Sequence, residues 1–456
     1  MAVASGIFRQ YDIRGIVGRD LTTEAAAAIG GAYAAYLSEQ GVQGGVVVSR
    51  DNRPSGTALR DARVDGLTGA GADVVDIGVV PTPLNYWALH HVMVAGGIQI
   101  TGSHNPPEYN GLKLSVGTIS LHGEEIQRLY ALTQTPRPAA TRRGTVRTTN
   151  VIDRYLDDIV ARIGPLSRRI RAVYDCGNGA GALVAPALFA RLGVEGRGLF
   201  CESDGTFPNH HPDPTVPENL EDLIRAVRAD RAEIGIAFDG DADRIGVVDE
   251  DGTIVWGDRV LILYARDVLE RTGRGQPIIF DVKCSQALPA AVTAAGGTPV
   301  MWKTGHSLIK EKMREMRAPI AGEMSGHMFF TEGFYGHDDA LYGAARLLRI
   351  LAASGRTVKQ LLADVPDFVS TPELRIEVPE ELKFGLVDRA VKHFRSTHDV
   401  IDVDGVRVLF GDGWGLIRAS NTQPVIVARY EAASAERLAQ IRGEMEGWLR
   451  AQGVRV

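Results

Sequence analysis

The chain has little cysteine and no cysteine spacing typical of a metal site. Its 456 residues include three cysteines, Cys176, Cys201 and Cys284, which lie far apart and form no Cys-x-x-Cys pair. Because the set is odd and scattered, it predicts neither a disulfide framework nor a zinc site. We therefore expect a reducing compartment, with the cytoplasm as the simplest choice.

Long apolar runs and an excess of basic charge are also missing. No segment is long and apolar enough to predict a membrane span, and the first 15 residues lack the basic and apolar parts of a secretion signal. The formal net charge of -6 gives no electrostatic basis for binding nucleic acid. We expect a monomer with no nucleic-acid or membrane partner.

The length and the apolar pattern indicate several α/β domains. A chain of 456 residues is too long for one hydrophobic core. An apolar run, a segment with helical periodicity and a second apolar run occur in series three times, which is typical of two parallel strands joined by a helix. The paired runs are residues 46–51 and 74–80, 172–175 and 198–201, and 278–281 and 298–302.

The last part of the chain has a different pattern. Residues 374–378, 405–409 and 425–430 read as strands, and residues 435–449 predict a closing helix, so a smaller α+β domain is expected. Residues 133–149 are rich in Thr, Pro and Arg without apolar periodicity, which predicts a linker. The predicted α/β domains are residues 1–148, 149–252 and 253–366, and the predicted α+β domain is residues 367–456.

Three aspartates at alternate positions are the most informative feature of the sequence. Asp239, Asp241 and Asp243 are followed by Arg244 and flanked by two apolar runs. In an extended segment the three carboxylates would share one face and repel one another unless a cation lay between them. Ligands that are all oxygen suit Mg²⁺ or Ca²⁺ rather than zinc or copper.

Two structures other than a metal-binding turn would also contain these aspartates. An acidic turn between strands is often only a solvated hairpin. An EF-hand loop would explain the three aspartates and Glu250 at its last position, but Arg244 replaces the glycine that this loop requires. The flanking runs also predict strands instead of helices. A metal-binding turn is favoured, with the choice between Mg²⁺ and Ca²⁺ open.

Ser103 lies in a loop that glycine and proline make rigid. The loop, residues 101–107, reads Thr-Gly-Ser-His-Asn-Pro-Pro and follows the apolar run at residues 97–100. Such a loop displays the serine hydroxyl, although an ordinary turn is an equally good interpretation. A hydrolase that pairs Ser103 with His104 is not favoured, because adjacent residues rarely align as nucleophile and base and no Gly-x-Ser-x-Gly motif is present.

Two further loops carry polar side chains suited to a sugar phosphate. Glu323, Ser325 and His327 alternate, so an extended loop would present a carboxylate, a hydroxyl and an imidazole on one face. Arg418 opens a cluster at residues 418–422 that offers a planar donor fork and short polar groups to a phosphate. Ordinary polar turns remain the alternative for both loops.

Taken together and in this order, the loops at Ser103, residues 239–244, residues 323–327 and residues 418–422 resemble the α-D-phosphohexomutase family, most closely its bacterial phosphomannomutase/phosphoglucomutase members. The likeness covers nearly the whole chain, starting at residues 11–15. It implies a heart-shaped molecule of three α/β domains with mixed sheets and one α+β domain, each giving one loop to a central cleft.

The resemblance also implies a role for each loop. Ser103 would carry a phosphoryl group and would bind one Mg²⁺ together with Asp239, Asp241 and Asp243. The residues implied to act on the transferring group are Arg14, Lys113, Arg244 and His306. The implied contacts to the sugar phosphate are Tyr11, His104, Lys283, Glu323, Ser325, His327, Arg418, Ser420, Asn421 and Thr422.

The implied reaction interconverts hexose 1-phosphates and 6-phosphates. Phospho-Ser103 would donate to the sugar, and the 1,6-bisphosphate would turn end for end and return its other phosphate, with glucose 1,6-bisphosphate as activator. Arg14, Lys113 and His306 are the candidates for the base, and the sequence does not choose among them. Phosphoglucosamine mutase, a metal-dependent sugar phosphatase and a non-catalytic sugar-phosphate sensor are the alternatives.

Two details refine these expectations. Ala242 stands where the family often has glycine, and its methyl group predicts ordinary backbone angles and a slightly altered metal loop. Met324 and Asn421 look like the residues of mannose and glucose mutases rather than those of phosphoglucosamine mutases.

Overall fold

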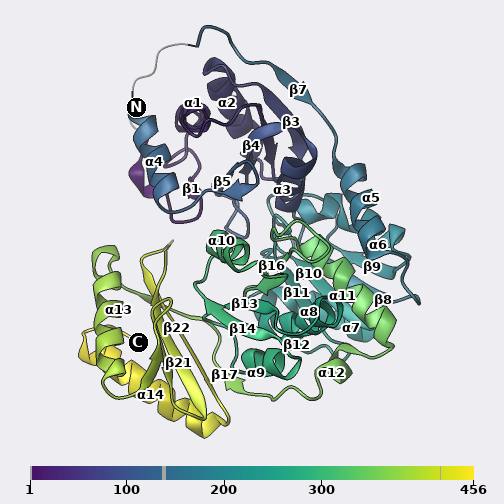
Figure 1. The fold of residues 1–456 in the computed structure, drawn as a ribbon, viewed down its shortest axis with the longest axis vertical. Helices are drawn as coiled ribbons and strands as arrows, with labels where there is room; N and C mark the ends of the chain where they lie inside the picture. Colours follow the sequence, from purple (N-terminus) through teal and green to yellow (C-terminus); the bar gives the residue numbers. More distant parts are fainter. Residues whose placement is uncertain (1–2, 136–139, 422) are drawn as a thin grey trace. The chain divides into compact units, whose positions relative to one another are not determined.

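The computed structural model describes residues 3–135, 140–421 and 423–456, so the phosphate contact expected of Thr422 lies outside the described residues. The chain forms two compact units, and Figure 1 labels many of their helices and strands. The first unit consists of Met1–Tyr264 and Ser325–Leu361, and the second of Ala265–Met324 and Leu362–Val456.

The first unit begins with a mixed sheet. Its strands are β1 (Ile13–Ile16), β2 (Gly45–Arg50), β3 (Val74–Val79), β4 (Val94–Ile100), β5 (Tyr109–Val116), β6 (Ile119–Ser120) and β7 (Val146–Thr148). The order is β1-β5-β4-β2-β3-β7, with β2 parallel to β3 and β4 and with β5 antiparallel to β4. Strand β4 ends just before the serine loop and β5 begins just after it, so that Ser103 follows β4 and Lys113 lies on β5.

Helices α1 (Thr23–Glu39), α2 (Gly56–Gly69), α3 (Thr82–His91) and α4 (Glu124–Thr133) accompany this sheet. Helix α1 is capped by Thr22, the residue before it, whose side chain accepts a hydrogen bond from the Ala25 amide at 3.1 Å. Its alanine-rich sequence favours a helix. Ile29 and Tyr33 lie on its buried face and join the hydrophobic core of this sheet.

A second sheet in the first unit carries the aspartate turn. Its strands are β8 (Arg171–Asp175), β9 (Glu195–Leu199), β10 (Ile234–Phe238), β11 (Ile245–Val248) and β12 (Ile254–Val255), in the order β12-β11-β10-β8-β9. Strand β8 is parallel to β9 and β10, whereas β10 and β11 form an antiparallel hairpin. The other elements are α5 (Ile152–Ile163), α6 (Ala185–Arg191), α7 (Glu221–Asp230), β16 (Met328–Phe330), α11 (Ala340–Ser354) and α12 (Val358–Leu361).

The second unit contains a parallel sheet and an antiparallel one. Strand β13 (Pro277–Asp281) is parallel to β14 (Thr298–Trp302) and to β15 (Ile320–Gly322). The helices α9 (Ala287–Ala294) and α10 (His306–Met316) belong to this part, and α8 (Gly257–Thr272) spans the boundary between the units.

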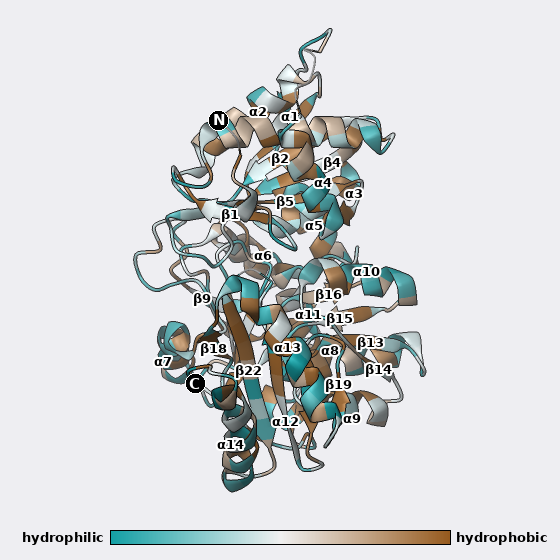
Figure 2. Cartoon of the chain, turned by 90° about the vertical axis from the view of Figure 1, so that its left-hand side faces the viewer, coloured by the Kyte–Doolittle hydropathy of each residue, from teal (hydrophilic) through white to brown (hydrophobic). Residues whose placement is uncertain are grey.

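The antiparallel sheet has the order β17-β22-β21-β20-β19, with β18 also paired to β22. Its strands are β17 (Val369–Ser370), β18 (Leu374–Glu377), β19 (Asp399–Ile401), β20 (Val406–Leu409), β21 (Gly413–Ala419) and β22 (Val425–Ala432). Its helices are α13 (Glu380–Arg395) and α14 (Ala435–Ala451). Figure 2 shows hydrophobic residues along these strands and hydrophilic ones on much of α14, as expected for a sheet covered by amphipathic helices.

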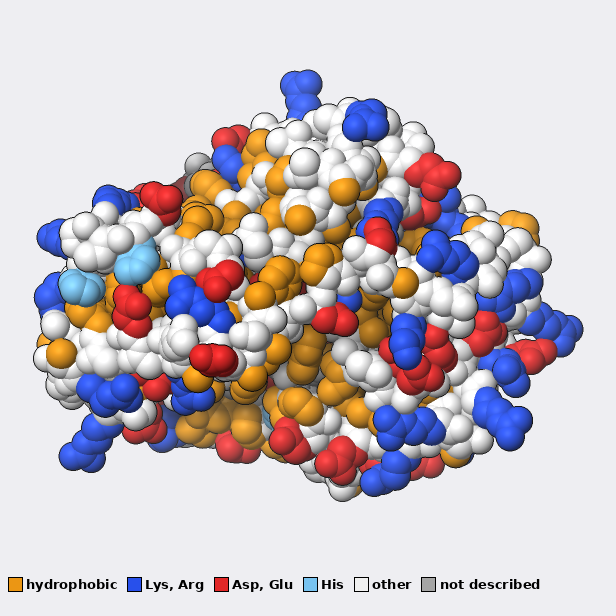
Figure 3. Space-filling model, turned by 90° about the horizontal axis from the view of Figure 1, so that it is seen from below, with side chains coloured by type: hydrophobic (Ala, Val, Ile, Leu, Met, Phe, Trp, Pro, Cys, Tyr) orange, Lys and Arg blue, Asp and Glu red, His pale blue; other side chains and the backbone are white. Residues whose placement is uncertain are grey.

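The predicted fold class, α/β with mixed sheets and a final α+β part, is confirmed. All three predicted strand pairs are parallel neighbours, namely β2 with β3, β8 with β9 and β13 with β14. None of the helices in the described ranges is both long and apolar enough to cross a membrane. Basic and acidic side chains are mixed over the face of the molecule drawn in Figure 3.

Two local predictions differ from the structure at strands on the edge of a sheet. The segment predicted as a linker, residues 133–149, also contains the short strand β7, which pairs with β3 and whose side chains are all exposed. Strand β9 ends at Leu199 instead of spanning residues 198–201, and its glycines pack against the ring of Tyr174. Because edge strands bury few side chains of their own, their sequences lack the apolar pattern from which a strand is predicted.

Arg63 on α2 is a buried cation that suggests a stability test. Its side chain is fully buried, and its three guanidinium nitrogens have no hydrogen-bond partner in the described part of the chain. Burial lowers its pKa to about 9, which means that the surroundings disfavour the charge.

We expect Arg63→Met to raise the free energy of unfolding by about 1–3 kcal/mol, since a buried charge without a partner is replaced by an apolar group of similar length. Urea denaturation followed by circular dichroism measures the change. Arg60→Met is the matched control on the same helix, because Arg60 pairs with Asp61 and Asp76, and it should give no gain. A loss of stability in Arg63→Met would contradict the argument.

Candidate active site

The turn between β10 and β11 brings three carboxylates together. Asp239, Asp241 and Asp243 are fully buried, and each offers an oxygen within 4.8 Å of the others. The turn is closed by the Ala242 amide, which donates to the Asp239 carbonyl oxygen at 3.0 Å. The carboxylates therefore converge through a tight turn, and not through the alternation of an extended segment that the pattern predicted.

The prediction of ordinary backbone angles at Ala242 is wrong. Its φ is 56°, in the left-handed region where a methyl group costs about 1–2 kcal/mol. Ala242 is completely buried, and a Cβ added to Gly181 would lie 3.2 Å from its methyl group. Because neighbouring backbone holds the residue on both sides, the turn keeps its left-handed conformation without a glycine.

The charges of the turn fit a divalent cation. Burial raises the pKa of Asp239 well above its usual range, and the neighbouring Asp243 and Asp241 add to the increase. The ammonium of Lys113 lies 3.1 Å from Asp241 and also contacts Asp243. Burial would raise the pKa of Asp241, but Lys113, Thr82 and Arg14 together outweigh burial and lower it.

One ammonium cannot neutralise three buried carboxylates. One oxygen of Asp241 and one of Asp243 are buried and accept no hydrogen bond from the described residues. Several carboxylate oxygens facing one small space, with spare acceptor atoms, are the ligand set that Mg²⁺ and Ca²⁺ prefer. The residues present therefore fit a hard divalent metal ion.

Ser103 lies directly against this turn. It is only 3% exposed, and its Oγ donates to the Asp239 carboxylate at 3.1 Å. A Cβ added to Gly240 would lie 2.4 Å from the carbonyl oxygen of Ser103, which is closer than atoms can approach. Glycine is therefore required at position 240 for the serine loop and the aspartate turn to meet.

Arg53 holds the serine loop, and the sequence analysis missed it. Its buried guanidinium donates to four backbone carbonyl oxygens, and its Nε lies 3.2 Å from the Asp51 carboxylate. The four acceptors are Ser103 at 2.7 Å, Asn105 at 2.6 Å, Pro106 at 2.6 Å and Tyr109 at 3.0 Å. The only signal in the sequence was the aspartate that ends the apolar run before it.

Ser103 also meets the residue that follows it. Its Oγ lies 3.0 Å from Nδ1 of His104, although the sequence analysis expected adjacent residues not to align. Burial lowers the pKa of His104 well below its usual range, and Arg244 and Arg14 lower it further. The imidazole is thus a neutral hydrogen-bonding partner of the serine hydroxyl.

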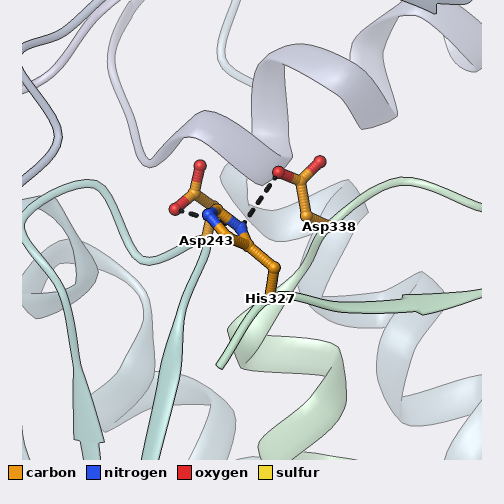
Figure 4. A group of neighbouring side chains, drawn as sticks. All are labelled: Asp243, His327 and Asp338. Atoms are coloured by element: carbon orange, nitrogen blue, oxygen red, sulfur yellow. Dashed lines mark ion pairs between the residues drawn. The ribbon is translucent and has the colours of Figure 1, made fainter. Parts of the chain in front are cut away.

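His327 lies between Arg244 and two aspartates, Asp243 and Asp338. Figure 4 shows the histidine with these two aspartates. Arg244 donates from Nε to Nε2 of His327 at 3.0 Å, so the histidine carries its proton on Nδ1. That Nδ1 lies 3.2 Å from Asp338 and 3.7 Å from Asp243.

The three residues drawn in Figure 4 also have the spacing of metal ligands. A metal would need an unprotonated Nδ1, which the hydrogen bond from Arg244 disfavours, so an ion-pair network is the better description. Asp338 was missed by the sequence analysis, because one acidic pair in a loop is no signal on its own.

The polar residues of the second unit form a network of their own. The Glu323 carboxylate accepts a hydrogen bond from the amide of Gly305 at 2.5 Å, and Gly305 is the residue before His306. Asp404 accepts from the Thr304 amide at 3.0 Å and from Arg418 at 2.9 Å, so one carboxylate holds both loops.

Lys283 lies 3.1 Å from Glu373. Lys283 lowers the pKa of Glu373 to about 2, and burial opposes this only in part. Neither Asp404 nor Glu373 was identified from the sequence.

The remaining predicted residues are placed as follows. In the first unit, Tyr11 precedes β1, Arg14 lies on β1 and contacts Asn105 and Asp12, and Ser325 is half-buried. In the second unit, Ser420 is buried after β21 and Asn421 is half-buried. Glu323 belongs to the second unit, whereas Ser325 and His327 belong to the first.

Comparison with known families accounts for this set of loops. Models of the phosphoglucomutase/phosphomannomutase α/β/α domains I, II and III match residues 5–139, 153–252 and 256–368. The C-terminal domain model of the same family matches residues 373–447. The chain belongs to the phosphoglucomutase/phosphomannomutase family. The family predicted from the loops is thereby confirmed, and the protein is an isomerase of the phosphohexomutase type.

Close relatives cover almost the whole chain. A phosphomannomutase/phosphoglucomutase of Pseudomonas putida is 47% identical over 97% of this chain and 95% of its own. A phosphoglucomutase of Neisseria gonorrhoeae is 46% identical over 98% and 97%. The crystal structure of a phosphoglucomutase/phosphomannomutase family protein from Burkholderia thailandensis has a TM-score of 0.91 and 45% identity, and covers 98% of both chains.

The contact at Gly240 allows a direct test of this site in the phosphohexomutase. We expect Gly240→Ala to lower mutase activity by at least about tenfold, since the methyl group must push the turn away from Ser103 and misplacements of about 1 Å are costly in catalysis. Circular dichroism should show the fold retained. Gly69→Ala is the control, because nothing lies within 4 Å of a Cβ added there, and it should keep full activity. Full activity in both variants would refute the required close approach.

Proposed function

We propose that this phosphohexomutase interconverts the 1-phosphates and 6-phosphates of mannose and glucose. The observation that carries the proposal is the buried Ser103 hydroxyl, 3.1 Å from Asp239 in a carboxylate cluster that fits a divalent cation. The names of the relatives, phosphomannomutase/phosphoglucomutase and phosphoglucomutase, support the choice of sugars. The three cysteines are free thiols, which supports the cytoplasm as its compartment.

In the proposed reaction, Ser103 carries the phosphoryl group that is exchanged with the sugar. A hydroxyl of the bound hexose phosphate attacks phosphorus, the bond from phosphorus to Ser103 Oγ breaks, and a hexose 1,6-bisphosphate forms. After this molecule turns end for end, Ser103 Oγ attacks its other phosphorus and the product leaves. Glucose 1,6-bisphosphate would start the cycle by phosphorylating Ser103.

The charges around Ser103 suit this transfer. Phosphoryl transfer depends on positioning and on neutralising the oxygens of the moving group. We propose that Asp239, Asp241 and Asp243, with a phosphoryl oxygen on Ser103, hold one Mg²⁺, which when bound supplies positive charge at those oxygens. Lys113, Arg14 and Arg244 contribute further cationic groups from the protein itself.

The proton of the attacking hydroxyl needs an acceptor. The guanidinium of an arginine such as Arg14 offers only hydrogen-bond donors. Asp241 and Asp243 outweigh the effect of burial and raise the pKa of Lys113 well above its usual range. These two are therefore poor bases, and His306 is the member of the predicted set that remains. His327 is not a better choice, because its Nε2 lone pair already accepts the hydrogen bond from Arg244.

Further polar groups that suit a sugar phosphate lie in the second unit. We propose that Glu323, Lys283 and Arg418 bind substrate hydroxyls and the phosphate that does not react, together with Ser420 and Asn421. Arg418 is held by Asp404, which fixes the direction of its guanidinium. A planar guanidinium with fixed orientation suits recognition of a phosphate.

Removing the serine hydroxyl tests the function. We expect Ser103→Ala to lose nearly all conversion of mannose 1-phosphate and glucose 1-phosphate, measured by a coupled assay with Mg²⁺ and a trace of glucose 1,6-bisphosphate. Ser38→Ala, at an exposed position on α1, should behave as the wild type. If the wild type converts neither sugar phosphate, the substrate assignment is wrong. A preference for glucosamine 1-phosphate would favour a phosphoglucosamine mutase.

Free phosphate distinguishes the mutase from a phosphatase and from a sensor. A mutase releases little inorganic phosphate, whereas a sugar phosphatase releases one equivalent for each turnover. A sugar-phosphate sensor would bind the sugar and give neither product. Measuring free phosphate in the same reactions therefore decides among the three classes.

Metal binding has a separate readout in thermal stability. An ion that binds only the folded protein stabilises it by about 2.7 kcal/mol when its concentration is about 100 times Kd. We expect Mg²⁺ to raise the Tm of the wild type, and Asp241→Asn to remove most of that rise. Asp65→Asn, at an exposed site, should keep the rise in full. An equal rise in all three proteins would argue against the aspartate turn as the site.

A further inference from the structure

Two cysteines that are distant in sequence meet beside the aspartate turn. Cys176 directly follows β8, and Cys201 lies two residues after the end of β9. The two strands are parallel neighbours, and their last residues, Asp175 and Leu199, lie opposite each other. Their Sγ atoms are 3.0 Å apart, and both are free thiols. Cys176 is fully buried, whereas Cys201 is partly exposed and open to a small oxidant.

The segment after Cys176 supports the aspartate turn. The Ala180 amide donates to the carbonyl oxygen of Gly240 at 2.9 Å. A Cβ added to Gly179 would lie 2.7 Å from the same oxygen, so the two backbones are in direct contact. A displacement of this segment is therefore transmitted to the turn that carries the three carboxylates.

The segment after Cys201 contacts the support of the serine loop. A Cβ added to Gly205 would lie 2.4 Å from the carbonyl oxygen of Asn52. The Asn52 side chain donates to Ser203 Oγ at 2.9 Å and to the carbonyl oxygen of Asn178 at 2.6 Å. Arg53, the next residue, holds the serine loop. The segments that follow the two cysteines therefore contact both the aspartate turn and the support of the serine loop.

We propose that Cys176 and Cys201 are a thiol pair which a peroxide oxidises to a disulfide, and that this disulfide lowers mutase turnover by displacing the support of the aspartate turn. The effect on turnover rests on the proposed function, whereas the formation of the disulfide does not.

The oxidation begins at Cys201, the more accessible thiol. A hydrogen bond from Cys176 lowers the pKa of Cys201, which favours its thiolate. The thiolate attacks one peroxide oxygen, the O–O bond breaks, and the leaving hydroxide takes a proton to form water. Cys201 is then a sulfenic acid.

The Cys176 sulfur next attacks the sulfenic sulfur and loses its proton, the S–O bond breaks, and a second water leaves. The two thiols have lost two electrons to hydrogen peroxide, and an external dithiol reverses the reaction by exchange.

Closing the bond requires movement near the site. The sulfurs must approach from 3.0 Å to a bond length of about 2.0 Å. Strands β8 and β9 are fixed by their parallel ladder, so the shift falls on the two segments that follow them. Since catalysis is sensitive to displacements of about 1 Å, we expect turnover to fall by roughly tenfold to a hundredfold.

The experiment treats the full-length protein with hydrogen peroxide in the presence of Mg²⁺, then alkylates free thiols and measures intact mass and turnover. We expect a loss of two hydrogen atoms, a linked peptide pair containing Cys176 and Cys201, and reduced turnover. Dithiothreitol should restore both the mass and the turnover.

Two variants complete the test. Cys201→Ser should form no disulfide and should keep its turnover after peroxide. Cys284→Ser, which retains a donor to Asp281, should respond as the wild type does.

Each contrary result has one meaning. A gain of oxygen without a link, or a link that involves Cys284, overturns the thiol pair. A Cys176 to Cys201 disulfide with unchanged turnover overturns the effect on the mutase. Reduced protein without mutase activity contradicts the proposed function instead, and the mass measurement still tests the disulfide.

Discussion

The site depends on one close approach between two backbones. The carbonyl oxygen of Ser103 lies where a side chain at position 240 would begin, so the serine loop and the aspartate turn meet only because residue 240 is glycine. Arg53 fixes the other side of the serine loop through four carbonyl oxygens. A buried guanidinium that binds backbone at several points, in addition to the Asp51 carboxylate, resists rotation of the whole loop, and the serine hydroxyl is oriented before any substrate arrives.

Buried charge is the second constraint. The three carboxylates, the Lys113 ammonium and the pair of His327 with Asp338 are all buried close to one another. Such an arrangement contributes little to folding stability, since desolvation offsets much of the attraction. The effect of these buried charges is electrostatic. A phosphoryl group that enters the site meets fixed charges instead of water that would have to reorganise.

The sequence predicted those features that local patterns encode. Parallel strand pairs such as β2 and β3 followed from buried apolar runs, and the family followed from four polar loops in a fixed order. Strand β7 was missed because exposed side chains at a sheet edge leave no apolar period. Arg53 was missed because the carbonyl oxygens that it binds lie at least 50 residues away in the sequence. Asp338 and Asp404 were missed because nothing local distinguishes a charged residue that organises a loop from one on the surface.

Ala242 shows how narrowly this architecture restricts its own sequence. A left-handed backbone strongly disfavours β-branched residues, and complete burial against Gly181 leaves no room for asparagine, which otherwise tolerates that conformation. Alanine and glycine satisfy both requirements, and a single base change separates their codons. The turn can therefore exchange these two residues without rearranging, whereas a larger side chain would have to displace Gly181 or the turn itself.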